Sequence, residues 1–487
     1  MRRLAPLVLV LAAGGVAQDR PSLHGKRPTT LVIQNVHVIT GDGSPPSGPT
    51  NVFVKDGLIT ADEPKPPEAT LDGTGCYLLP GLVSTHAHLQ EEAAGIPIAT
   101  EFQLDLWLAC GITTIRDLGS NWSRSLRLRE RAAKGEIAAP RIFLYKSFGP
   151  VASADEARAR VRACKTSGAD GIKLWSNFSY DRDLLAAILD EAGKQELRCT
   201  AHIGVGKSNA VDYAELGVSS IEHWYGIPDA ALDGVQDFPP EFSYSNELHR
   251  FRYAGRLWRE TKPEKLDAVL QYLVDKHVAW SPTLAIYEAS RDLMRAQNQP
   301  YFRDYLHPAL EKFFQPNLEN HGSYFVGWTT TDEVYWKENY TIWMRAVRDF
   351  ARKGGIVTTG EDAGFIYVLY GFGLLRELEL QHEAGFHPLE VIKHATHHGA
   401  LVLGQEQRFG LVRPGFAADL VLVDGNPLEN LKLLYPTGAD VWQGGKMVHR
   451  GGVQWTLKEG TVWHAPTLAK QAREIVQQAR AARAGVK

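Results

Sequence analysis

Short apolar runs alternate with longer amphipathic stretches through the middle of the chain. Eight runs read as buried strands, at 83–88, 112–117, 142–145, 171–175, 199–203, 219–223, 278–283 and 356–359. Helical patterns lie between them, for example at 154–164, 182–194, 265–276 and 340–353. Because strands that alternate with helices form parallel sheets, this pattern predicts an α/β fold built on a (β/α)₈ TIM-like barrel.

Both ends of the chain show a different pattern, in which short strands are separated by turn residues. The strand-like runs lie at 30–40, 51–59 and 76–79, and again at 419–423, 441–443 and 446–449. We therefore predict a small β-sandwich domain from residues 29–80 plus 409–455. The barrel then occupies 81–408, with long insertions at 224–263 and 286–339, and 456–487 form a helical extension whose polar helix covers 466–484.

The first seventeen residues have the pattern of a signal peptide. Arg2 and Arg3 precede an apolar core at 4–13, and Gly15-Val16-Ala17 fits a cleavage site. The core is too short to span a bilayer about 30 Å thick, so we expect no stable membrane anchor. This pattern predicts an exported protein, periplasmic or secreted.

Composition excludes several classes of protein. A formal charge of −3 gives no reason to expect a nucleic-acid partner. The chain has 4 cysteines and no Cys-x-x-Cys pair, which argues against a disulfide scaffold and a cysteine-built zinc or redox site. The partner that we expect is a small-molecule substrate.

Candidate metal ligands follow the predicted barrel strands. His86 and His88 are two residues apart on one strand, so both imidazoles face the same side. Lys173 lies in an apolar strand, and the remaining candidates, His202, His223 and Asp362, end or follow later strands. The carboxyl ends of barrel strands are where active sites form in this architecture.

These motifs, taken in order, resemble the amidohydrolase superfamily, and in particular its imidazolonepropionase-like and prolidase-like branch. The resemblance covers about residues 30–455. The motifs that carry it are PGLVSTHAHL (80–89), GITTIRDLG (111–119), GADGIKLW (168–175), TAHIG (200–204), SSIEHW (219–224), TGEDAG (359–364) and LVRPGFAADLVLVDGNPLEN (411–430).

The resemblance implies a site with two divalent metal ions, zinc before manganese, iron or cobalt. It implies that His86, His88 and Asp362 bind one ion and that His202 and His223 bind the other. Lys173 would bridge both ions as a carbamate formed from CO₂. A shared water would become hydroxide and attack the substrate carbonyl, while Asp362 acts as general base and then as general acid.

Three features leave alternatives open. Glu361 stands where threonine is common in the family, and it either ligates a metal, raises the pKa of Asp362 or points away. The aromatic-rich segment 287–345 is either a lid over an apolar substrate or a small core within its insertion. Arg116, Trp175 and Tyr225 are candidate substrate-binding residues, although Arg116 would equally suit a structural ion pair.

The leading hypothesis is an exported binuclear amidohydrolase that cleaves a C–N amide bond in a dipeptide, an N-acyl amino acid or a cyclic amide. One alternative keeps the site but cleaves a lactone or another ester. A catalytically inactive binding barrel is a third possibility, and a homo-oligomer is compatible with each of them.

Overall fold

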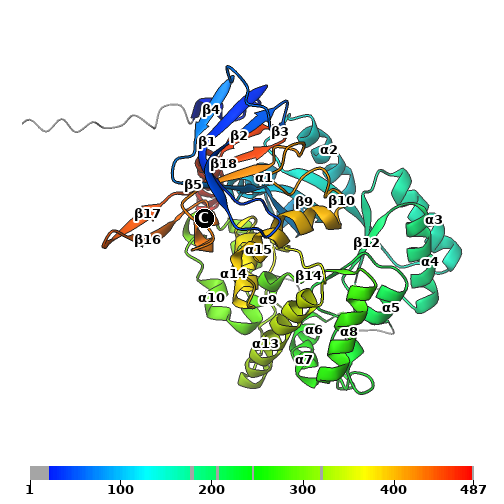
Figure 1. The fold of residues 1–487 in the computed structure, drawn as a ribbon. Helices are drawn as coiled ribbons and strands as arrows, with labels where there is room; N and C mark the ends of the chain where they lie inside the picture. Colours follow the sequence, from blue (N-terminus) through cyan, green and yellow to red (C-terminus); the bar gives the residue numbers. More distant parts are fainter. Residues whose placement is uncertain (1–20, 176–179, 205–207, 244–245, 318–321, 485–487) are drawn as a thin grey trace, which may run out of the picture.

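A computed structural model describes residues 21–175, 180–204, 208–243, 246–317 and 322–484. The predicted signal peptide lies outside these residues. Two sheets organise the molecule (Figure 1). Within the described part of the chain, no helix combines the length and the apolar character needed to cross a membrane.

The larger body is a nearly closed barrel around a seven-stranded parallel sheet. Its strands are hydrogen-bonded in the spatial order β14-β13-β12-β11-β10-β9-β6, which is sequence order around the barrel. They are β6 (Leu82–Ala87), β9 (Ile112–Leu118), β10 (Arg141–Phe148), β11 (Gly171–Leu174), β12 (Arg198–Ala201), β13 (Ser220–Glu222) and β14 (Ala279–Ser281). All residues of β6 and β9 are buried, as expected when helices cover a parallel sheet.

Helices connect successive strands as the sequence pattern predicts. The main ones are α1 (Thr100–Ala109), α2 (Trp122–Ala133), α3 (Ala154–Thr166), α4 (Arg182–Lys194), α5 (Ala210–Glu215), α8 (Pro263–Asp275), α13 (Thr330–Arg352), α14 (Phe372–Glu383) and α15 (Pro388–Lys393). Helix α13 begins ten residues before the predicted start at 340, because Thr329 caps it in a reciprocal capping box with Asp332.

The eighth predicted strand, 356–359, is reduced to a single bridge. Val357 pairs in parallel with Trp280 on β14. On the other side, the Thr85 amide of β6 donates to the Thr359 carbonyl at 2.8 Å. The segment therefore contacts both edges of the sheet, but it makes too few ladder bonds to form a strand of its own.

Strands from both ends of the chain form the second sheet, an eight-stranded one. The amino-terminal strands are β1 (Thr30–Val38), β2 (Ser47–Lys55), β3 (Leu58–Thr60), β4 (Ala69–Asp72) and β5 (Cys76–Pro80), and the carboxyl-terminal ones are β15 (Leu420–Asp424), β18 (Gly452–Lys458) and β19 (Thr461–His464). Strand β15 pairs antiparallel with β5 on one side and with β18 on the other. The strands form one continuous sheet, so a two-layer sandwich is not confirmed.

Two details of the predicted domain boundaries need correction. The boundary at 455/456 falls inside β18, and the sheet continues to His464 before α17 (Ala465–Ala484) begins. The predicted strands 441–443 and 446–449 form a separate hairpin, β16 (Ala439–Gln443) and β17 (Lys446–Arg450). They are excluded from the sheet because β18 already occupies the edge of β15.

Asp105 on α1 provides a test of the core beside this sheet. Its side chain is buried, and desolvation together with the charge of Glu101 raises its pKa to about 7. A folded-state pKa above the unfolded value of 3.8 means that stability is full below about pH 4 and is lost as the pH rises through 7. The free energy of unfolding of Asp105→Asn should therefore exceed that of the parent by up to about 4 kcal/mol at pH 8 and should equal it at pH 4. Urea titrations at both pH values measure the difference. A difference that is the same at both pH values would contradict this assignment.

Candidate active site

The predicted metal ligands gather at the carboxyl ends of the barrel strands. His86, His88 and Asp362 each place one ligand atom within 4.8 Å of the others. The imidazole rings of His86 and His223 are 4.8 Å apart, and those of His202 and His223 are 4.4 Å apart. The barrel thus brings these residues from four chain segments into one cluster.

The backbone turns sharply where this cluster forms. His223, Thr283 and Asp362 have positive φ angles of 62°, 52° and 49°. Such conformations cost a residue with a side chain about 1–3 kcal/mol each, and they concentrate at functional sites. They follow β13, β14 and the bridging segment 356–359, and they turn each side chain into the mouth of the barrel.

Hydrogen bonds fix the protonation of two histidines. His86 Nδ1 lies 2.7 Å from the Glu222 carboxylate, which can only accept, so Nδ1 carries the proton. His223 Nδ1 lies 2.6 Å from Thr283 Oγ1, whose own proton goes to the Pro282 carbonyl. Both rings therefore present the unprotonated Nε2 atom to the cluster.

Acceptor atoms face one another across the centre of the cluster. The Asp362 carboxylate lies 3.6 Å from His86 Nε2 and 3.8 Å from His223 Nε2. Burial lowers the pKa of His86 to about 4 and that of His223 well below its usual value, so both imidazoles are neutral at pH 7. Lone pairs and a carboxylate repel one another at these distances unless a cation lies between them. The donor set therefore fits a divalent metal ion with nitrogen and oxygen ligands.

Asp362 itself remains ionised. Burial alone would raise the pKa of its carboxyl group, but the neighbouring His86, His88 and His223 hold that pKa well below its usual range. The side chain is thus a carboxylate that can bind a cation or accept a proton from a molecule in the barrel mouth.

Lys173 on β11 is fully buried beside this cluster. Its Nζ atom makes no hydrogen bond to any described residue and lies 5.3 Å from the centre of the Trp175 ring. Desolvation lowers its pKa to about 8, with Arg116 acting in the same direction. With a pKa of about 8, about a tenth of the molecules carry the neutral amine at pH 7, which is the form that reacts with CO₂.

Comparison with known proteins agrees with this geometry. The model of the amidohydrolase family matches residues 343–449. A putative prolidase from Bifidobacterium longum superposes with a TM-score of 0.63 at 20% identity, over 92% of this chain and 100% of that one. Aspergillus niger ochratoxinase superposes with a TM-score of 0.62 at 18% identity, over 91% and 97%. The chain is thus similar to the amidohydrolase family in part of its sequence and in its fold.

Curated relatives match this chain over short stretches. Thermus aquaticus dihydroorotase is 38% identical over 61 residues, 12% of this chain and 14% of that protein. Ochratoxinase from Aspergillus niger is 39% identical over 82 residues, 16% and 17% respectively. The matched stretches span less than a fifth of these relatives, so they show local similarity and leave the substrate open.

Arg116 forms a structural ion pair, one of the two alternatives that the sequence left open. Its guanidinium is fully buried and donates to the Thr85 carbonyl at 2.5 Å, to Ser220 Oγ at 3.2 Å and to Glu222 Oε1 at 2.5 Å. These three bonds hold the guanidinium against groups of the barrel interior, so the structural ion pair is present.

Trp175 and Tyr225 lie beside the candidate ligands. The Trp175 ring stacks at 6.2 Å from His88, and its Nε1 donates to Ser147 Oγ at 2.9 Å. Tyr225 is fully buried and stacks at 5.1 Å from His202. Trp175, which is partly exposed, can contact a molecule in the mouth, whereas Tyr225 supports the back of the His202 ring.

Glu222 is the functional residue that sequence analysis missed. It is fully buried and accepts hydrogen bonds from His86, Arg116 and Thr200. Burial would raise its pKa, but Arg116 and His86 hold the pKa well below its usual range, so it is a carboxylate. The sequence contained a signal that could have identified Glu222, because a charged residue lies inside a predicted buried strand. Lys173 was identified by the same signal.

The aromatic residues of the second insertion form a core. Trp336, Tyr340 and Trp343 of α13 are fully buried, and Tyr324 stacks on Phe251 at 3.5 Å. This is the packed-core alternative, and it argues against a lid of these aromatics. One contact reaches the site, because the Tyr287 ring of α9 (Leu284–Arg291) meets His223 edge to face at 5.6 Å.

Glu361 points away from the candidate ligands. Its carboxylate accepts from Trp107 Nε1, from the Gly371 amide at 2.8 Å and from the Leu374 amide at 3.2 Å. It therefore caps the amino terminus of α14, while burial raises the pKa of its carboxyl group to about 8. The structure therefore shows the alternative in which Glu361 points away from the metal site.

This position yields a prediction for stability. Glu361→Gln leaves one acceptor oxygen for three donors, so the free energy of unfolding in urea should fall by about 1–3 kcal/mol. Metal content should stay unchanged, because the side chain does not contact the ligands. Loss of metal without loss of stability would show instead that Glu361 belongs to the metal site.

Proposed function

We propose that this amidohydrolase hydrolyses C–N amide bonds of small molecules at a site with two divalent metal ions. The observation that carries the proposal is the set of acceptor atoms from His86, His223 and Asp362, which face one another around a space that only a cation would stabilise. Two similar structures are named as a prolidase and a Xaa-Pro dipeptidase, which favours an amide over an ester bond.

The ligands divide into two groups in this proposal. His86, His88 and Asp362 would hold one ion, and His202 and His223 would hold the other. Lys173 lies close enough to His86 and His223 to interact electrostatically with both, and as a carbamate it would be a further anionic oxygen ligand. Bound divalent ions would polarise the substrate carbonyl and lower the pKa of a water molecule.

The residues of the chain would then move one proton. The Asp362 carboxylate accepts a proton from the attacking water and returns it to the leaving nitrogen as the C–N bond breaks. Glu222 keeps the proton of His86 on Nδ1, and Thr283 does the same for His223, so that both Nε2 atoms stay available as ligands.

Elemental analysis of the protein purified without chelator tests the metal site. We expect close to two equivalents of divalent metal in the parent and a loss of at least one in Lys173→Gln. Lys146→Gln is the matched control. Lys146 lies on β10, and its Nζ atom donates a hydrogen bond of 3.1 Å to Ser167 Oγ, which is not one of the candidate ligands. No metal after supplementation with zinc or manganese and bicarbonate would contradict the mechanism.

A substrate panel tests the bond. Xaa-Pro dipeptides and N-acyl amino acids should be hydrolysed faster than lactones by the metal-loaded enzyme. Activity on lactones alone would overturn the amide assignment and leave the metal site intact.

Export is a separate part of this proposal and is supported by residues 1–17. Mass spectrometry of the protein recovered from its native host should find Gln18 as the first residue. An intact amino terminus at Met1 in a cell extract would contradict it.

A further inference from the structure

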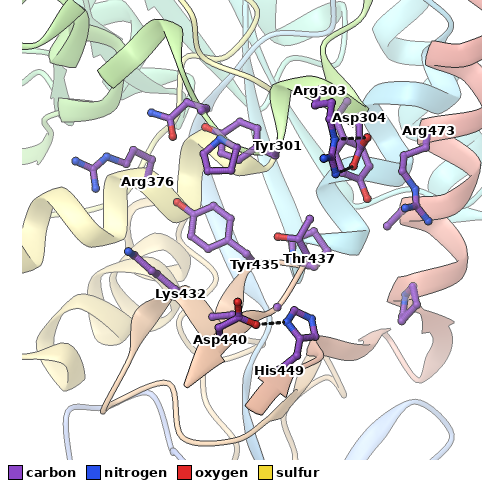
Figure 2. A pocket seen from close by; sticks show the side chains of 18 of the residues that line it. Tyr301, Arg303, Asp304, Arg376, Lys432, Tyr435, Thr437, Asp440, His449 and Arg473 are labelled. Atoms are coloured by element: carbon purple, nitrogen blue, oxygen red, sulfur yellow. Dashed lines mark hydrogen bonds and ion pairs between the residues drawn. The ribbon is translucent and has the colours of Figure 1, made fainter. Parts of the chain in front are cut away.

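A cavity of about 890 Å³ lies apart from the candidate metal ligands, where four parts of the chain meet (Figure 2). Its walls come from the insertion helices α10 (Leu293–Gln297) and α11 (Phe302–Tyr305), from α14, from the loop after η4 (Leu431–Leu434) with the β16–β17 hairpin, and from α17. None of the candidate catalytic residues lines it. Its volume is in the range of small-molecule sites.

Tyrosine rings form an apolar wall of this cavity. Tyr301 and Tyr435 lie 6.2 Å apart with their planes inclined by only 26°. Phe372 supports Tyr301 from behind at 4.2 Å, and the Tyr435 hydroxyl donates to Glu379 at 2.7 Å. Both rings line the cavity and are held in place, so although each residue is only 8% exposed, they offer a small preformed aromatic surface to a ligand.

Most charges in the wall are already neutralised. Arg376 forms a bidentate pair with Glu288, at 2.9 and 2.5 Å, and also contacts Glu379 at 2.7 Å. On the hairpin, His449 lies 2.9 Å from Asp440. These groups stabilise the wall and are not available to a ligand.

Two cations in the wall have no such neutralisation. Lys432 and Arg473 form no ion pair with a carboxylate of any described residue, and Arg473 contacts only the face of Tyr305, at 6.0 Å. Figure 2 shows Lys432 and Arg473 on either side of Tyr435. The cavity therefore combines a flat aromatic wall with two separate unpaired positive charges.

The hairpin extends this surface outward. Asp440 and Trp442 are two residues apart and share one face, and Trp442 pairs across the hairpin with Met447. Trp442 is 72% exposed and Met447 58% exposed. Exposed apolar side chains of this size at the edge of a polar cavity are typical of binding sites.

We propose that this cavity binds a flat aromatic dianion, of the class of aryl dicarboxylates. The ring would lie against Tyr301 and Tyr435, and one carboxylate would meet Lys432 while the other meets Arg473. This site is separate from the proposed catalytic one, and its occupancy does not depend on the amide chemistry.

Isothermal titration calorimetry of the full-length, metal-loaded protein tests the proposal with three matched probes. These are naphthalene-2,6-dicarboxylate, 2-naphthoate and the uncharged 2-naphthamide. We expect the dissociation constant to rise about tenfold with each lost charge, because a charge-assisted hydrogen bond is removed at each step. Equal affinity for the dianion and the amide would overturn the proposal, as would no binding of any probe at millimolar concentration.

Two variants locate the site. Lys432→Gln and Arg473→Gln should each weaken binding of the dianion about tenfold without changing amide hydrolysis. Lys446→Gln is the control, since Lys446 is an exposed lysine of the same hairpin outside the cavity wall, and it should bind like the parent. Binding that neither cavity variant alters would place the probe elsewhere, for example at the metal ligands, and would refute the site.

Discussion

Asp362→Asn should lower kcat/KM for amide hydrolysis about a thousandfold. Asparagine cannot accept the proton of the attacking water, and general acid–base catalysis supplies rate factors of roughly 10²–10⁴. The variant should also bind less metal, because an amide nitrogen replaces one of the acceptor atoms that face His86 and His223. Steady-state kinetics on an amide found in the substrate panel, together with elemental analysis, measures both effects.

The substitution should not disturb the backbone, because asparagine tolerates the φ angle at this position. Asp362 has a φ of 49°, a region that asparagine and aspartate adopt more readily than other residues with side chains. The fold should therefore persist, with an unchanged circular dichroism spectrum. Asp349→Asn, on the outer helix α13, is the matched control and should keep full activity. A variant of Asp362 with more than a tenth of parental activity would exclude it as the proton carrier.

Glu222→Gln should lower the free energy of unfolding by about 3–5 kcal/mol. The change removes the partner of Arg116, whose guanidinium is fully buried, and breaking one side of a buried ion pair has a cost of this size. Urea unfolding at pH 7 measures it. Metal affinity should fall about 10- to 100-fold in the same variant, because the single oxygen of glutamine cannot accept from both Arg116 and His86.

A double variant separates these two effects. Arg116→Met with Glu222→Leu removes both buried charges together, so most of the lost stability should return. Metal affinity should remain low, since leucine cannot accept the His86 proton. If the double variant regained metal affinity as well, Glu222 would act on the site only through stability.

The positions of the candidate ligands could be predicted because they follow from periodicity. A strand turns alternate side chains to one face, which places His86 and His88 together, and parallel strands bring their carboxyl ends to one edge. Lys173 could be predicted because a lysine within an apolar run is unusual. The structure places all of these residues in one cluster, as expected, although their roles as ligands remain proposals.

What could not be predicted depends on contacts between distant segments. The Glu361 carboxylate turns to α14 because the amides of Gly371 and Leu374 lie there, and no local pattern reports that arrangement. Arg116 finds Glu222 across the barrel, 106 residues away in sequence. The length of the eighth strand could not be predicted for a related reason. Segment 356–359 forms only a single bridge to β14 and one backbone bond to β6, and these contacts come from distant parts of the chain.

The sheet built from both chain ends has a consequence for how the polypeptide is made. Arg27 bonds to the carbonyl of Glu459, 432 residues later, so this contact cannot form until almost the whole chain has been synthesised. At roughly 5–20 residues per second, the edge of β5 that β15 later occupies is exposed for about 17–70 s. Open strand edges recruit other chains, so a chaperone that shields nascent strands should increase the yield of folded protein more than one that acts after release from the ribosome.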